Sequence, residues 1–91
     1  MATLKVSNKS EVKKVAGAIA GELKKEKVAT IIAVGPHAVN QTVKAIATAR
    51  GFVTQDGFDL TCVPNFEQVK IDTEDRAAIR FTVKLIGGDN E

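Results

Sequence analysis

Hydrophobic residues in the first part of the chain follow the period of a strand, then of a helix, then of a strand again. Residues 3–6 alternate weakly, which predicts a short strand. From about Glu11 to Lys25, apolar residues recur every three or four positions, which predicts a helix with one apolar face. Ser10 is expected to cap this helix, and Glu11 to lie in its first turn. Residues 28–34 form a continuous, largely β-branched run that is typical of a buried strand.

A second helix is predicted directly after the buried strand. Gly35 and Pro36 end the strand, and proline suits the first position of a helix because its missing N–H needs no partner there. Helical spacing then continues to Arg50, and Gly51 is expected to end the helix as its C-cap.

The second half of the chain changes to the two-residue period of strands. Apolar and polar residues alternate over residues 58–67 and again over 77–85, with a polar segment at 72–76 between them. This pattern predicts a long antiparallel hairpin whose tip lies at about Asp72–Arg76. The apolar phase shifts near Gln68 and Val69, which favours a bulge or a twist there.

The predicted order is βαβαββ, an α+β two-layer sandwich with two helices on one face of a four-stranded mixed sheet. Residues 1–86 are expected to form a single domain, and residues 87–91 a disordered tail. The chain has 91 residues, four Phe and no Trp or Tyr, so its core is small and aliphatic, which favours a second copy as partner. Gly17 and Gly21 each cost the first helix about 1 kcal/mol, which predicts close packing of that helix on the sheet.

Several classes of protein do not fit this sequence. No apolar run is long enough to span a membrane, and the first ten residues lack the apolar core of a signal peptide, so we expect a cytoplasmic protein. Cys62 shares a strand face with apolar residues and is interpreted as a small buried hydrophobe. The acidic residues Asp72, Glu74 and Asp75 are typical of a solvated turn. We therefore expect no enzyme, no cofactor and no metal site.

Charge is distributed unevenly between the two halves of the chain. Residues 1–50 contain nine basic and three acidic residues, a balance of +6, whereas residues 51–91 contain four basic and eight acidic residues, a balance of −4. This asymmetry predicts a basic face that meets an anionic partner. A solvated surface whose two halves attract each other explains it equally well.

The turn at Gly35-Pro36 is the main candidate for a binding site. A strand-to-helix turn directs free N–H groups outward, where the helix dipole favours an anion. The helix behind it carries a polar ridge made of His37, Gln41, Lys44 and Thr48, and no acidic residue occurs from His37 to Gln55. The ridge can bind an anion, or it can be the ordinary wet side of an amphipathic helix, with His37 a surface or capping residue.

Three segments together resemble the stage V sporulation protein S family. They are "VAGAIAG" at residues 15–21, "NQ-x-VKA-x-A-x-ARGF" at 40–52 and "ID-x-E-x-R-x-AI" at 71–79, and the resemblance extends over about residues 3–85. It implies a small cytoplasmic bacterial regulator connected with sporulation and developmental decisions, with an Alba-like βαβαββ fold.

The resemblance also implies a way of binding nucleic acid. Alba-like proteins are dimers that bind DNA or RNA through basic residues in the loop after the first strand and at the start of the second helix. The corresponding residues here are Lys9, Lys13 and Lys14 in the first region, and His37, Gln41 and Lys44 in the second. No aromatic residue is expected to be exposed, so base stacking is not expected to contribute.

Two functions of different classes follow from these observations. The first is a sequence-tolerant nucleic-acid-binding homodimer, in which lysines neutralise phosphates. The second is a protein-interaction adaptor that contacts another regulator through the acidic hairpin at Asp72, Glu74 and Asp75, without binding nucleic acid directly.

Overall fold

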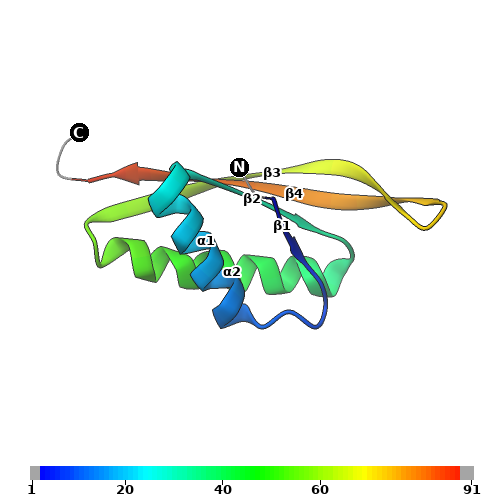
Figure 1. Ribbon diagram of the computed structural model, residues 1–91, viewed down its shortest axis with the longest axis horizontal. Helices are drawn as coiled ribbons and strands as arrows, with labels where there is room; N and C mark the ends of the chain where they lie inside the picture. The colour runs from blue at the N-terminus through cyan, green and yellow to red at the C-terminus, as the bar shows by residue number, and fades with distance from the viewer. Residues whose placement is uncertain (1–2, 89–91) are drawn as a thin grey trace.

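The computed structural model describes residues 3–88 and has the predicted order of elements (Figure 1). The elements are β1 (Thr3–Val6), α1 (Val12–Glu26), β2 (Val28–Ala33), α2 (Pro36–Thr54), β3 (Phe58–Ile71) and β4 (Glu74–Gly87). The α+β fold class is therefore confirmed. None of the helices in this range is long and apolar enough to cross a membrane.

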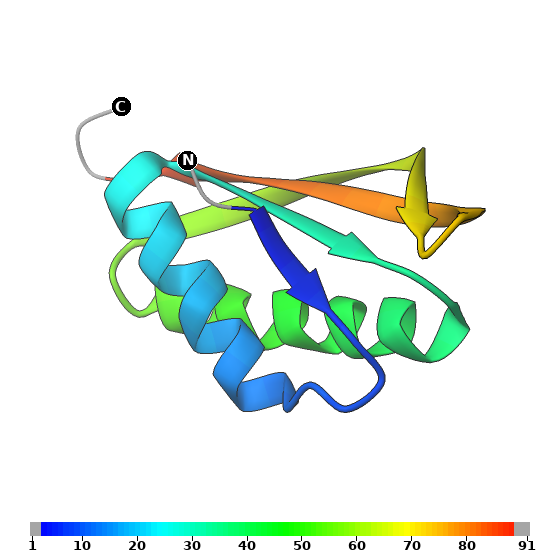
Figure 2. The same cartoon turned by 45° about the vertical axis from the view of Figure 1, so that its right-hand side comes forward.

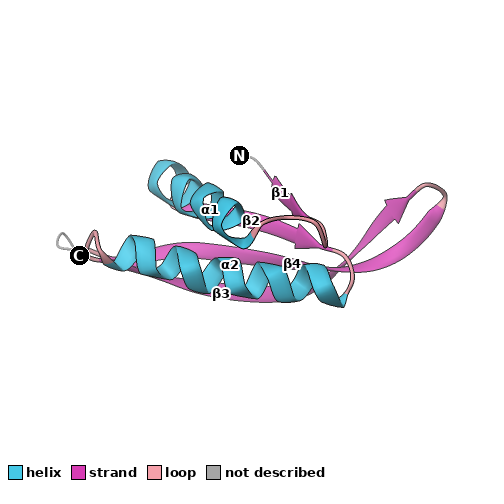
Figure 3. Ribbon diagram, turned by 90° about the horizontal axis from the view of Figure 1, so that it is seen from below, coloured by secondary structure: helices cyan, strands magenta, loops and turns pink. Residues whose placement is uncertain are grey.

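The four strands form one mixed sheet in the order β1-β2-β4-β3. β1 is parallel to β2, whereas β4 is antiparallel to both of its neighbours, β2 and β3. Both helices lie on the same face of the sheet, as predicted (Figure 3). α1 is the crossover that a parallel β1–β2 pair requires, because it returns the chain to the end of the sheet where β1 begins.

The core lies between the sheet and the two helices. α1 contributes Ile19 and Leu23, which are fully buried, and β2 and β4 contribute Ile31 and Val83, which are fully buried as well. Fully burying an aliphatic side chain contributes about 1.5–3 kcal/mol, so these few residues account for much of what holds the layers together. Cys62 is half-buried against this core, and burial raises the pKa of its thiol.

The β3–β4 hairpin extends past the helical layer and curves at its far end (Figures 1 and 2). Its register is unbroken from Phe58↔Gly87 to Ile71↔Glu74, so of the two predicted alternatives the bulge does not occur and the strand pair twists. The tip is tighter than predicted, because Asp72, with a φ of 60°, and Thr73 make the turn alone. Asp75 and Arg76 therefore belong to β4.

The start of α1 differs from the prediction. Ser10 does not cap the helix, because its hydroxyl accepts a hydrogen bond of 3.0 Å from the backbone N–H of Ser7 in the preceding loop. Glu11 occupies the N-cap position without a side-chain capping bond. Gly17 and Gly21 are exposed and a Cβ at either position would meet no neighbour within 4 Å, so the predicted close packing at these glycines is wrong.

α2 is longer than predicted, because Gly51 lies inside it rather than at its end. The last turn is held by Val53, which is 1% exposed and joins the core on the same helix face as Ala49. Burial of Val53 outweighs the cost of about 1 kcal/mol for a helical glycine. At the chain end, Gly87 is the last residue of β4 rather than the first of a tail. Of the other residues of the predicted tail, Gly88 follows the strand and residues 89–91 lie outside the described residues.

Candidate nucleic-acid interface

The loop between β1 and α1 lies against the N-terminal half of α2. Gln41 on α2 donates a hydrogen bond of 3.1 Å from Nε2 to the backbone carbonyl of Ser10. The loop is also closed on itself, because the backbone N–H of Lys9 donates to the hydroxyl of Ser7 at 3.2 Å. Lys9 therefore stands on a loop that is fastened to the second helix. Two regions far apart in the sequence are brought together in this way.

A hollow of about 520 Å³ lies where this loop, the start of α2 and the hairpin meet. Asn8 of the loop, His37 of the first helical turn and Arg76 of β4 line it, together with Gly35. Gly35 is the N-cap of α2, and its φ of 91° is readily adopted only by glycine. The first turn of α2 has no acidic residue, so the positive end of the helix dipole is not neutralised from within.

Arg76 is a residue of this site that the sequence did not indicate. In the sequence it adjoins acidic residues and looks like part of an acidic tip, but the acidic residue nearest in sequence, Asp75, forms an ion pair with Lys70 at 3.7 Å instead. Arg76 lines the same hollow as His37 because the hairpin curves toward the start of α2. The position of Arg76 beside the start of α2 depends on the curvature of the hairpin, which the periodicity of the sequence does not indicate.

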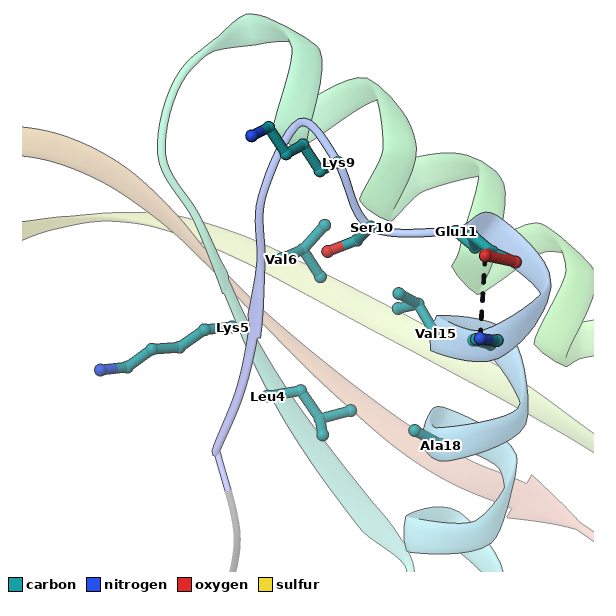
Figure 4. Close-up of a pocket in the computed structure, with 9 residues that line it drawn as sticks. Leu4, Lys5, Val6, Lys9, Ser10, Glu11, Val15 and Ala18 are labelled. Carbon is teal, nitrogen blue, oxygen red and sulfur yellow. Dashed lines mark ion pairs between the residues drawn. The ribbon is translucent and has the colours of Figure 1, made fainter.

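Three of the predicted lysines lie at different places around the loop. Lys9 and its neighbour Lys5 project to the side of β1 that faces away from α1 (Figure 4). Lys14 lies on α1, with its ammonium 3.7 Å from the carboxylate of Glu11, and both side chains are exposed. Such an exposed pair contributes at most about 1 kcal/mol, so Lys14 can exchange Glu11 for another anion. Lys13 is exposed on the first turn of α1.

The polar ridge predicted on α2 is only partly free. Gln41 is half-buried and held by the loop, and the hydroxyl of Thr48 donates a hydrogen bond of 2.8 Å to the backbone carbonyl of Lys44. His37 and Lys44 remain exposed on the same helix, two turns apart. Gln41 therefore positions the loop, and its contact with nucleic acid stays a prediction.

Some basic side chains of residues 3–88 form ion pairs and others do not. Outside the loop region, basic side chains with a carboxylate within 4.0 Å form the pairs Lys24–Asp56, Arg50–Asp59, Lys70–Asp75 and Arg80–Glu67. Arg50 holds Asp59 with two hydrogen bonds, of 2.8 and 3.1 Å, and the guanidinium lowers the pKa of that carboxyl. By contrast, no described carboxylate lies within 4.0 Å of the ammonium groups of Lys9, Lys13 and Lys44. Lys25, Lys27 and Lys84 also lack such a partner in the described part of the chain, so Lys9, Lys13 and Lys44 differ from them by their position around the loop and α2 rather than by pairing alone.

The expectation that no aromatic side chain is exposed is wrong. Phe66 is 82% exposed and Phe52 is 41% exposed. Phe66 has the same strand phase as Phe58, Leu60 and Cys62, but β3 has passed the end of the helical cover at this point. It borders an apolar hollow of about 210 Å³ whose other walls include Pro36, Val39 and Ile79. Val43, one turn along α2 from Val39, is 52% exposed.

Within residues 3–88, no three His, Cys, Asp or Glu side chains are grouped so that they could hold a metal ion. The arrangement offers cations, free helix N–H groups and hydroxyls, which are the groups that bind phosphate oxygens in proteins.

Comparison with known proteins agrees with the fold. The structure is similar to that of Alba from Thermoplasma volcanium, with a TM-score of 0.61 and 13% sequence identity, over 93% of this chain and 99% of that chain. At this identity the similarity establishes the Alba-like fold alone. The family model described as "Stage V sporulation protein S (SpoVS)" matches residues 2–86, which is nearly the whole chain. The chain therefore belongs to the stage V sporulation protein S family.

Proposed function

We propose that this protein is a non-enzymatic cytoplasmic regulator that binds DNA or RNA in a sequence-tolerant way, as a homodimer, and acts in sporulation or developmental control. The observation that carries this proposal is the fastening of the Lys9 loop to α2 by the hydrogen bond from Gln41 to Ser10. It unites the exposed cations of the β1–α1 region with the positive end of α2.

Binding would proceed mainly by neutralisation of phosphates. Lys9, Lys13, Lys14 and Lys44 are exposed, and only Lys14 has a carboxylate within ion-pair distance among the described residues. Cations without an internal partner release condensed counterions when they meet a polyanion, which makes the affinity depend steeply on salt. His37 and Arg76 line one hollow beside the start of α2, where a single phosphate group can accept hydrogen bonds from both.

A second copy of the chain is supported by the exposed apolar surface around Phe66. Aromatic residues are enriched at interfaces, and an isolated domain gains nothing from an exposed phenyl ring. Phe66, Val39 and Val43 supply apolar area on β3 and α2, and the hollow beside Phe66 offers space for a side chain from the partner. Burying this surface would add to a core that is small for an independent domain.

The experiment is a low-salt binding titration with fluorescent mixed-sequence DNA and RNA. The parent is compared with a variant in which Lys9, Lys13, Lys14 and Lys44 are all replaced by Ala. A matched control removes the same charge elsewhere, through replacement of Lys24, Lys25, Lys70 and Lys84 by Ala.

Loss of binding in the first variant, with binding retained in the control, supports the proposal. Equal binding by all three proteins, or no binding by the parent at any salt concentration, contradicts it. In the second case, variants of Asp72 and Glu74 would test the acidic hairpin as a contact for a protein partner.

A further inference from the structure

The strand β1 has a free edge, and a partly apolar hollow lies beside it. β1 is the first strand of the sheet order and pairs only with β2 among the described strands. The hollow has a volume of about 390 Å³ and is lined by residues of β1, the following loop and α1. No residue of β2 lines it, so it opens on the side of β1 that is not paired. A free strand edge and a hollow of this size are two independent features at one place.

The floor of this hollow is apolar and its surroundings are basic. Leu4 and Val6 of β1 face Val15 and Ala18 of α1 across the gap (Figure 4). Lys5 projects to the opposite side of β1, and Lys9 points to that side as well. On the α1 side, the sole carboxylate in the lining, that of Glu11, is already paired with Lys14.

We propose that the edge of β1 binds an extended peptide segment in which apolar and acidic residues alternate. A strand added beside β1 directs alternate side chains to opposite faces of the sheet. One set would enter the hollow between β1 and α1 and meet the apolar part of its lining, Leu4, Val6, Val15 and Ala18. The other set would lie on the outer face beside Lys5, where a carboxylate meets an ammonium. Main-chain hydrogen bonds to β1 provide affinity, and the two faces provide specificity.

The charge of the edge determines which occupant fits. Lysine on a short edge strand ordinarily discourages strand addition. Lys5 would repel a basic segment, and it would also repel β1 of a second copy, which carries the same lysine. An acidic segment reverses this effect, because Lys5 becomes its ion-pair partner. This hollow adjoins the one at His37 and Arg76, with which it shares Val6, and Lys9 and Lys14 line it too. The inference rests on the edge of β1 and does not depend on nucleic-acid binding.

The test uses the full chain and a fluorescein-labelled synthetic peptide of alternating glutamate and valine. We expect saturable binding in fluorescence anisotropy, and no binding of the matching peptide of lysine and valine. Lys5→Glu should weaken the affinity at least about threefold, because it replaces attraction by repulsion. Ala18→Gln should weaken it too, because the longer side chain occupies the hollow. Lys25→Glu makes the same charge change on the last turn of α1, outside the hollow, and should leave the affinity within about twofold of the parent.

Hydrogen exchange locates the peptide and does not require any variant to fold. Bound peptide should slow exchange of backbone amides in Thr3–Val6, with no change in β3. The proposal is overturned if the peptide does not bind, if Lys5→Glu and Lys25→Glu weaken it equally, or if protection appears at β3. It is also overturned if a DNA oligonucleotide, and not the peptide, protects the β1 amides, since that would assign the edge to nucleic acid.

Discussion

Gln41 and Ser10 are 31 positions apart in the sequence, yet the side-chain amide of the first donates a hydrogen bond of 3.1 Å to the backbone carbonyl of the second. This hydrogen bond is part-buried, and it connects α2 to the β1–α1 loop. It fixes where Lys9 stands relative to the start of α2, and so links the fold to the proposed binding surface.

Replacing Gln41 should therefore affect both stability and binding. Gln41→Ala removes one part-buried hydrogen bond and should lower the free energy of unfolding by about 1 kcal/mol, as measured by urea denaturation. The affinity for mixed-sequence DNA should fall as well, because the Lys9 loop is no longer held in one position. Asn40→Ala, at the exposed neighbouring position, serves as the control: it should leave DNA affinity unchanged and should not lower the free energy of unfolding, because alanine is the better helix former. Unchanged DNA affinity in a folded Gln41→Ala protein would show that the position of the loop is irrelevant to binding.

The two exposed glycines of α1 should tolerate a side chain. Gly17→Ala and Gly21→Ala should each raise the free energy of unfolding by about 1 kcal/mol, because alanine is the better helix former and a Cβ meets nothing within 4 Å. Chemical denaturation at a low protein concentration measures this directly. A loss of stability at either position would mean that another backbone approaches α1 in solution.

The ion pair between Arg50 and Asp59 should make stability depend on acid pH. The guanidinium lowers the pKa of Asp59 in the folded protein, so this contribution is present above the pKa of the unfolded chain and is lost as the pH falls through the folded-state pKa. Asp59→Asn should therefore lower the melting temperature at neutral pH. The difference from the parent should shrink once the pH drops below about 4. A difference that stays constant from neutral to strongly acidic pH would exclude the ion pair as its cause.

Phe66 provides the test of self-association. Phe66→Ser should raise the dissociation constant of the homodimer about tenfold or more, because buried aromatic residues are frequent hot spots of interfaces. Sedimentation velocity over a range of concentrations measures this constant. Val63→Ser, which replaces a 62% exposed residue on the opposite face of the same strand, is the control. A parent that sediments as a monomer at all concentrations would contradict the proposed dimer.

Periodicity was sufficient to predict the order of elements, because each element buries one regular face. α1 buries Ile19 and Leu23, β2 buries Ile31, and β4 buries Phe81 and Val83, all at the spacing read in the sequence. The end of α2 was not predictable in the same way. Gly51 is a strong local signal for the end of a helix. The burial of Val53 beyond it depends on packing against the rest of the core, which a local sequence pattern does not indicate.

The candidate site was predicted only in part, because exposure and pairing depend on how distant segments meet. The sequence indicated the loop and the start of α2, and the Gln41–Ser10 bond does bring them together. It did not indicate Arg76, which lies at the site because the hairpin is curved. Nor did it indicate the exposure of Phe66, which arises because β3 extends past the helices. Whether Lys9, Lys13, Lys14 and Lys44 contact nucleic acid stays a prediction.

The most direct test of the central claim is the salt dependence of DNA affinity for the parent and the two quadruple lysine variants. The slope of log affinity against log salt concentration reports the number of phosphates neutralised, at about 0.9 per contact on duplex DNA. Loss of Lys9, Lys13, Lys14 and Lys44 should flatten the slope by about 3 to 4, whereas loss of Lys24, Lys25, Lys70 and Lys84 should leave it nearly unchanged. Equal flattening in both variants, or a parent affinity that does not vary with salt, would contradict a defined basic surface at the start of α2.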